Sequence, residues 1–455
     1  MSSRLYKTLA LNLILILLVV TLSCNRGQAL VYFLNFKPEV AKVYEDVAKA
    51  YEDETGVKVK VVTASAGTYE DTLTSEVLKT NQPTIFQVNG PIGYSKWKEY
   101  CYDLKNTNLY KTLIDKTTAI TENGNVYGIP FAIEGYGLVY NKTVFSEYFA
   151  QDNKATSLNN VDEITNFNQF KEIVVDLDKY IKGEKPLKNA PSIEKLEGVF
   201  ASTSLSSGSQ WPYQTHLANI PFYYEFLEKN PDNAVLGGLD IKTGEFEFKY
   251  NQEFKNVFDL YLNYGVKEKT TLGTVTTNYA ATEFGTGKAA ILQQGNWIYN
   301  EISKITEGNV ITKDNIGMMP IYIGHENEET LTIPVGTENY FCVNKKVSQE
   351  KIDASIKFLE WLFSSETGKD FVINKLGFIA PFTTFTADEK PQDPLAKEVL
   401  RLMEMTNRTS IPWAFTAIPS DEFKNEFGGM LLLYAQGQKT WEDVVNKVKE
   451  VWVVK

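Results

Sequence analysis

The chain has 455 residues, of which 43% are hydrophobic and 13% aromatic, so it is long enough for two or three domains with buried cores. Its formal net charge of −11 argues against DNA or RNA as a partner, because an acidic surface repels phosphate backbones. The two histidines, His216 and His325, have no partners at metal-ligand spacing, and no Ser-His-Asp or Cys-His arrangement is evident. We therefore expect no metal, no cofactor and no catalytic residues.

The N-terminus has the pattern of a secretory signal. Arg4 and Lys7 precede the apolar run Leu9–Leu22, which is shorter than the ~20 apolar residues that span a membrane. The residues that end at Cys24 resemble a bacterial lipoprotein box, in which the cysteine is acylated and anchors the mature protein. We expect residues 1–23 to be removed and Cys24 to carry a lipid. A soluble secreted protein and an uncleaved anchor are the alternatives.

Strand-like and helix-like segments alternate after this signal. Leu30–Phe36 is a short apolar run typical of a strand, and the helical pattern after it begins near Pro38 and ends at Gly56. The segment "VKVKVVTAS" alternates as a second strand, "TYEDTLTSEVLKT" is typical of a helix, and Pro83–Gly90 is a strand with a buried pattern. This order predicts a parallel α/β sheet, with a ligand crevice at the carboxyl ends of its strands.

The middle of the chain is less regular. Asn125–Phe145 is strand-like, is broken by glycine and proline, and carries one carboxylate, Glu134, within an apolar run. Ser202–His216 is rich in serine and glycine and predicts a loop with Trp211 and Tyr213 at its tip. A strand after Val335, the helix "QEKIDASIKFLEWLFSS" and two C-terminal helices complete the pattern, which indicates two interleaved α/β lobes.

The segment "FGTGKAAILQQGNW", Phe284–Trp297, looks at first like a phosphate loop. A dinucleotide loop follows a strand and opens a helix, whereas here a helical pattern precedes the glycines and a strand pattern follows them. The Walker pattern also fails, because Thr282 replaces its first glycine and Ala289 replaces the Ser/Thr that would hold magnesium. We interpret the segment as a helix, a glycine turn, a strand, and a loop that presents Asn296 and Trp297.

That segment resembles the signature of the family 1 extracellular solute-binding proteins of ABC transporters, roughly F-x-x-G-K-A-A-(I or M)-x-x-x-G-x-W. Other stretches are similar to the same family in the same order: "YEDVAKAYEDETGVKVKV", "VYGIPFAIEGYGLVYNKTVF", "ASIKFLEWLFSSETGKDF", "SIPWAF" and "YAQGQKTWEDVVNKVKEVW". Together they cover nearly the whole chain after Cys24. The chain is thus identified as a maltose-binding-protein-like member of this family.

The resemblance implies an α/β fold of the two-lobed periplasmic-binding-protein type II. Its lobes are interleaved and joined by hinge segments. We expect lobe 1 at residues 24–133, lobe 2 at 134–334, a return to lobe 1 at 335–381, and a helical C-terminal part at 382–455, mainly in lobe 2. The implied function is that of a monomeric extracytoplasmic receptor, anchored to the cell membrane as a lipoprotein. Such a receptor closes on a neutral sugar and delivers it to permease subunits.

The resemblance also indicates ligand-binding residues. Trp297 and Trp413 match positions that stack on sugar rings, and Trp211, or Tyr213 in its place, is a third aromatic candidate. Carboxylate and amide groups then form hydrogen bonds with the hydroxyl groups of the sugar. A carboxylate is a strong acceptor, and an amide both donates and accepts. The polar candidates are Asn35, Lys37, Glu39, Gln87, Asn89, Glu134 and Asn296. The alternatives are core packing for the tryptophans, a structural hinge role for Glu134, and helix-capping or surface roles for the residues after the first strand.

Competing interpretations stay open at this point. A secreted glycoside hydrolase needs two carboxylates ~5–9.5 Å apart across the cleft, and Glu134 has no obvious partner. The same fold binding a peptide or polyamine is the other alternative. The loop "FQVNGPIG" after the third strand lacks the aromatic and charged residues of maltose-binding protein, so the sugar need not be a maltodextrin. Cys101 and Cys342 either form a disulfide or stay as buried thiols.

Overall fold

The computed structural model describes residues 29–65, 68–229, 246–337 and 339–453. The predicted signal peptide, residues 1–23, and the predicted lipid anchor, Cys24, lie outside the described residues. Within the described part of the chain, no helix is long and apolar enough to cross a membrane.

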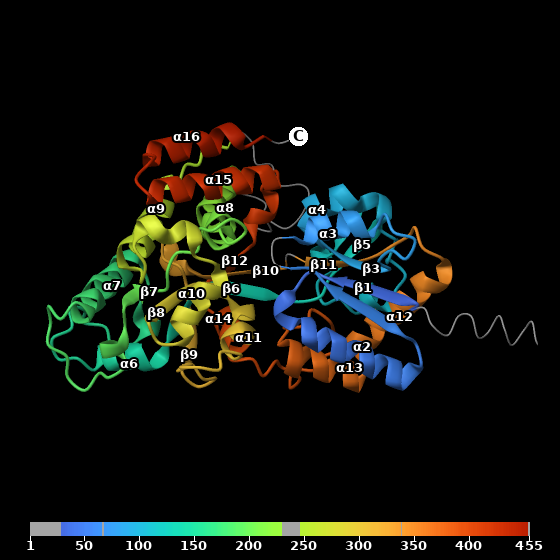
Figure 1. Ribbon diagram of the computed structural model, residues 1–455, viewed down its shortest axis with the longest axis horizontal. Helices are drawn as coiled ribbons and strands as arrows, with labels where there is room; N and C mark the ends of the chain where they lie inside the picture. The colour runs from blue at the N-terminus through green and yellow to red at the C-terminus, as the bar shows by residue number, and fades with distance from the viewer. Residues whose placement is uncertain (1–28, 66–67, 230–245, 338, 454–455) are drawn as a thin grey trace, which may run out of the picture.

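The described residues form two mixed β-sheets, which lie side by side in Figure 1. The first, at the right, has the strand order β2 (Val59–Thr63), β1 (Val31–Asn35), β3 (Ile85–Asn89), β11 (Asn339–Val343), β5 (Asn125–Pro130) and β4 (Ile120–Glu122). The second has the order β12 (Thr409–Ile411), β10 (Leu331–Gly336), β6 (Glu134–Asn141), β8 (Ala289–Gly295) and β7 (Gly198–Phe200), and β9 (Ile316–Met319) also pairs with β6. The predicted two-lobed α/β fold is confirmed.

Helices pack on both faces of the first sheet, so its central strands are buried on both sides. Side chains alternate along β1, so Phe33 packs under α2 (Ala41–Thr55) and α12 (Gln349–Ser364), whereas Leu34 packs on the opposite face against α3 (Tyr69–Glu76) and α4 (Gly90–Trp97). The strands β2 and β3 pair in parallel with β1, as predicted. The shorter helices of this half are α5 (Asn108–Thr112) and α13 (Glu366–Asp370).

The second sheet is built around β6, every residue of which is buried. The strands β8, β9 and β10 pair antiparallel with it, and their apolar side chains pack beneath the surrounding helices. Those helices are α6 (Lys142–Phe149), α7 (Phe167–Ile181), α8 (Ala218–Lys229), α9 (Asn251–Tyr264), α10 (Thr277–Gly285), α11 (Tyr299–Ile302), α14 (Pro394–Met403), α15 (Asp421–Ala435) and α16 (Trp441–Val451).

The chain passes between the two sheets at strand ends. It leaves the first sheet after β5, at Pro130, and enters the second at Glu134, the first residue of β6. It returns from β10, which ends at Gly336, to β11, which begins at Asn339. Residues near these passages come from both sheets, so side chains that are distant in the sequence meet there.

The predicted loop Ser202–His216 is wrong in its second half. Pro212–Leu217 forms a π-helix that continues into α8, with Pro212 at its first turn, where a missing backbone N–H is tolerated. Tyr213 therefore does not lie at a loop tip. It is buried in the core of the second half of the molecule, and its hydroxyl accepts a hydrogen bond from the backbone N–H of Ser204 at 3.2 Å.

The two cysteines beyond the N-terminal segment are neighbours in the fold. Cys101 and Cys342 are buried free thiols in one apolar cluster, and Cys101 donates to the Trp97 carbonyl oxygen at 3.4 Å. Burial, together with a hydrogen bond with Cys101, raises the pKa of the Cys342 thiol well above its usual value. Since the thiolate is the reactive form, the raised pKa disfavours reaction of Cys342, and burial keeps reagents away from both thiols in the folded protein.

We therefore expect iodoacetamide to leave Cys101 and Cys342 unmodified in the native protein and to alkylate both in urea. Peptide mass spectrometry measures the two sites separately. Resistance to alkylation in urea that disappears after reduction would instead show that the two cysteines form a disulfide.

Candidate functional site

A buried ion pair joins the two sheets. Lys37 follows β1 in the first sheet, and Glu134 begins β6 in the second. The Lys37 Nζ lies 2.7 Å from Glu134 Oε1, and the two residues are 6% and 4% exposed. Glu39 lies on the same ammonium at 3.7 Å, and burial raises its pKa despite the opposing effect of Lys37. Two carboxylates therefore share this one ammonium, and burial disfavours the charged form of Glu39.

An aromatic cluster lies against this ion pair on the side of the second sheet. The Lys37 Nζ is 5.8 Å from the centre of the Trp297 ring. The Trp211 and His216 rings lie 6.0 and 5.6 Å from that same ring, and Trp413 lies 6.3 Å from His216. Trp211 and Trp297 are only partly buried, whereas Trp413 is 3% exposed. Three tryptophans from distant segments therefore meet beside the ion pair.

Glycines hold two of these indoles in place. A Cβ on Gly295 would lie 2.2 Å from the Trp297 ring, and a Cβ on Gly336 would lie 2.7 Å from Trp413 Cγ. Any other residue at either position would displace the ring from the backbone it packs on. The Trp297 indole N–H also donates to Gln294 Oε1 at 3.0 Å, which orients the ring.

His216 lies within the cluster, 4.3 Å from the Tyr136 ring between centroids. Burial, with smaller contributions from the charges of Lys424 and Lys37, lowers the pKa of His216 from 6.5 to about 3. In the unfolded chain the same imidazole takes up its proton near pH 6.5, so unfolding binds a proton between those two values. Above pH 6.5 the imidazole is neutral in both states, so it does not oppose folding. As the pH falls from 6.5 towards 3, the unfolded state alone gains the proton, and the folded protein loses stability.

We expect His216→Phe to remove this pH dependence. The unfolding free energy of the wild type, relative to the variant, should fall by up to roughly 1.4 kcal/mol per pH unit as the pH drops below 6. Urea denaturation of both proteins between about pH 7 and pH 4 measures the difference. Other groups cancel in this comparison, including Asp393, whose pKa burial raises to about 6. Parallel pH curves would contradict the assignment.

Polar side chains end the strands of the first sheet at the same edge. The Asn35 amide donates to the Lys37 carbonyl oxygen at 2.8 Å and accepts from the Lys37 N–H at 3.0 Å, so it shapes the turn that places Lys37. Gln87 Oε1 accepts from the Phe36 N–H at 2.5 Å. Within the part of the chain that the structure describes, the buried Gln87 Nε2 and Asn89 Oδ1 atoms have no hydrogen-bond partner.

The structure thus brings six of the predicted residues into one group: Lys37, Glu39, Glu134, Trp211, Trp297 and Trp413. Asn296 lies beside them, but its Oδ1 accepts from the Gly135 N–H at 3.0 Å, so its amide holds the start of β6. Among the described residues, no group of three or more His, Cys, Asp or Glu side chains is placed to hold a metal ion.

Sequence reasoning missed three residues that border the site. Tyr136 lies two positions after Glu134 on the same strand, so strand alternation was the signal that could have indicated it. Tyr44, on α2, is fully buried, and burial followed by the charges of Glu39 and Glu134 raises its pKa well above the usual value. His216 gave no sequence signal, because its position depends on the π-helix.

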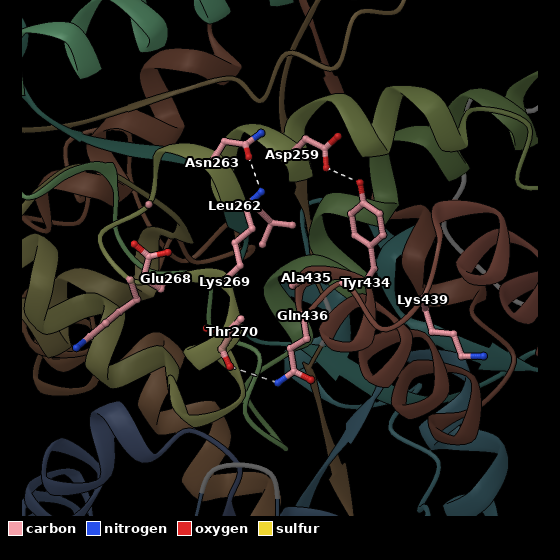
Figure 2. A pocket seen from close by; sticks show the side chains of 13 residues that line it. Asp259, Leu262, Asn263, Glu268, Lys269, Thr270, Tyr434, Ala435, Gln436 and Lys439 are labelled. Carbon is pink, nitrogen blue, oxygen red and sulfur yellow. Dashed lines mark hydrogen bonds between the residues drawn. The ribbon is translucent and has the colours of Figure 1, made fainter. Parts of the chain in front are cut away.

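A separate groove of about 570 Å³ lies on the second half of the molecule, between the end of α9 and the loop that follows α15 (Figure 2). Its polar groups pair with one another: Tyr434 donates to Asp259 at 2.8 Å, and Lys269 donates to Asn263 at 2.6 Å. Since these groups already have partners, and six of the thirteen lining residues are exposed, we place the candidate site at the junction of the sheets instead.

The fold is shared with several solved structures. RafE in complex with raffinose matches with a TM-score of 0.65 at 16% identity, over 93% of this chain and 98% of that chain. A sugar transporter from Bacillus licheniformis in complex with stachyose matches with 0.64 at 16%, over 93% and 99%. The GacH receptor of Streptomyces glaucescens, solved unliganded and with acarbose, matches with 0.63 at 14%, over 93% and 97%. At these identities the likeness shows the fold alone.

A comparison with curated protein sequences finds no significant match. The sequence pattern of the bacterial extracellular solute-binding proteins, in contrast, matches residues 46–398, well over half of the chain. That region contains most of both sheets, the Lys37 partner Glu134, and two of the three clustered tryptophans. The family consists of binding proteins rather than enzymes, and its members act outside the cytoplasm. This chain belongs to the bacterial extracellular solute-binding protein family.

Proposed function

We propose that this protein is the receptor of an ABC importer that captures a neutral sugar or oligosaccharide between its two lobes. The observation that carries the proposal is the group of three tryptophans beside the balanced Lys37–Glu134 pair at the junction of the sheets. An indole face offers a flat apolar partner to the C–H face of a sugar ring. Raffinose, stachyose and acarbose in structures of the same fold support a sugar as the ligand.

The charges around the site favour a neutral ligand. The Lys37 ammonium and the Glu134 carboxylate offset each other at 2.7 Å, and the raised pKa of Glu39 favours its neutral form. A polyamine would need several free carboxylates, and a strongly acidic ligand would need several free cations. A neutral sugar needs neither, because hydroxyl groups accept and donate hydrogen bonds without a net charge.

Capture follows from the two-lobed architecture. We take residues 24–133 and 335–381 as one lobe and residues 134–334 and 382–455 as the other, joined by the passages before Glu134 and after Gly336. A ligand between the lobes contacts both lobes in the closed form. It therefore stabilises the closed form by the difference between its affinities for the closed and the open forms. Delivery to permease subunits, a lipid anchor on Cys24 and a monomeric state belong to the same proposal.

Isothermal titration calorimetry with raffinose, stachyose, acarbose and xylotriose tests the function. We expect saturable heat with at least one sugar, and no new sugar in the mixture by chromatography. Products of hydrolysis would point to a glycoside hydrolase. Absence of binding to every sugar, with binding of a peptide or of spermidine, would overturn the proposal in favour of a different solute.

A further inference from the structure

Unsatisfied polar atoms collect where β11 begins. The Oδ1 atoms of Asn89 and Asn339 are both buried without a hydrogen-bond partner among the described residues, and so is the indole nitrogen of Trp413. Asn339 and Trp413 are each 3% exposed. Folded proteins satisfy the great majority of such groups, because an unpaired buried polar atom costs about 1–3 kcal/mol. A cluster of unpaired atoms in one place indicates that something absent from the polypeptide binds there.

The two asparagines lie side by side. Asn339 is opposite Asn89 in the antiparallel pairing of β11 with β3, so both side chains point to the same face of the sheet. Gln87 lies two residues back on β3 and shares that face, and its buried Nε2 also has no partner in the described ranges. The three amides thus form one polar strip at the carboxyl end of β3.

This strip faces the second half of the molecule. Gly90, next to Asn89, is so close to η11 (Ala414–Ala417) that a Cβ there would lie 3.7 Å from Thr416. Trp413 immediately precedes η11 and packs on Gly336, which lies three residues before Asn339. The strip therefore continues the aromatic cluster at the passage between the two sheets, in contact with segments from both.

We propose that Asn89 and Asn339 form a subsite that binds two neighbouring hydroxyl groups of the sugar, with Asn339 as a specificity-determining residue. The inference rests on the proposed function. Paired amides suit adjacent hydroxyls, because each amide both donates and accepts, whereas a charged or apolar ligand group would leave them unpaired.

The test is Asn339→Ala, with Asn344→Ala as the matched control. Asn344 follows the other end of β11 and is fully buried, but its amide donates to Gln82 Oε1 at 2.9 Å and to the Pro83 carbonyl oxygen at 2.8 Å. Calorimetry with the tightest-binding sugar of the panel measures Kd, and thermal denaturation without sugar measures stability. Both readouts are needed to separate a ligand contact from a structural role.

We expect Asn339→Ala to weaken Kd about tenfold with little change in the melting temperature, because it removes no hydrogen bond from the unliganded protein. Asn344→Ala should lower the melting temperature and leave Kd within about twofold of the wild type. The order of affinities among the four sugars should also change in Asn339→Ala, which a structural role would not produce.

An unchanged Kd and an unchanged order in Asn339→Ala would overturn the subsite while leaving the sugar receptor in place. If that variant fails to fold, Asn89→Ala decides the question from the opposite strand by the same measurements. If the wild type binds none of the sugars, the proposed function fails and this inference fails with it. That result is distinguishable, since it appears before any variant is compared.

Discussion

Trp297→Ala should weaken binding of the tightest-binding sugar by about 100-fold or more, while the protein stays folded. Trp297 is central to the aromatic cluster: Trp211, His216 and the Lys37 ammonium all lie within about 6 Å of its ring. Buried aromatic residues commonly contribute most of the binding energy at an interface. A polar side chain cannot replace the flat apolar face that an indole offers to a sugar ring. Because the indole is partly exposed and packs at the margin of the core, its loss should lower the melting temperature only modestly.

Trp361→Ala is the matched control for this prediction. Trp361 is also partly buried, and its indole donates to Glu54 Oε2 at 2.7 Å, between α12 and α2 of the first half of the molecule. Its loss should reduce stability and leave Kd for sugar unchanged. Calorimetry and thermal denaturation of both variants measure the two effects. Global unfolding of Trp297→Ala would instead mean that this tryptophan is a core residue.

Glu134→Gln should destabilise the unliganded protein by about 3 kcal/mol, because it leaves the buried Lys37 ammonium without its nearest counter-charge. Lys37 and Glu134 are both nearly inaccessible, so water cannot replace the lost partner. Lys37→Met should be destabilising for the converse reason. The double variant Lys37→Met/Glu134→Gln should be more stable than either single variant, since it removes both charges of the pair. Urea denaturation measures all three.

The exposed pair of Lys42 and Asp46 is the control for the ion-pair variants. Its Nζ–Oδ1 distance is also 2.7 Å, but the two side chains are 75% and 52% exposed. Asp46→Asn should therefore produce no measurable change in stability, because solvent screens the pair. A double Lys37/Glu134 variant as unstable as the sum of its single variants would show that the two charges do not interact across the sheets.

Local elements were predictable because their determinants are local. The helix α2 is an example, because its apolar face predicts a helix. Gly56 ends it with a φ of 73°, a left-handed conformation that glycine tolerates. The order of helix, glycine turn, strand and tryptophan in Phe284–Trp297 was enough to reject a phosphate loop, and α10 and β8 confirm it. The loop predicted at Ser202–His216 was wrong from Pro212 onwards, because the serine and glycine residues before it suggested a loop where the apolar segment that follows packs as a helix.

Sequence by itself determined the class of the fold, the alternation of elements in the first sheet, and the side chains that deserve testing as ligand contacts. Tertiary structure decided what those side chains do. Glu134, which the sequence predicts as a sugar contact, pairs with Lys37, 97 residues earlier, and no local pattern indicates that pairing. Asn339 stands opposite Asn89 only because β11 joins a sheet formed some 250 residues before it. Periodicity and capping act within a few residues, whereas charge pairing, indole packing and unpaired amides depend on which strand ends the folded chain brings together.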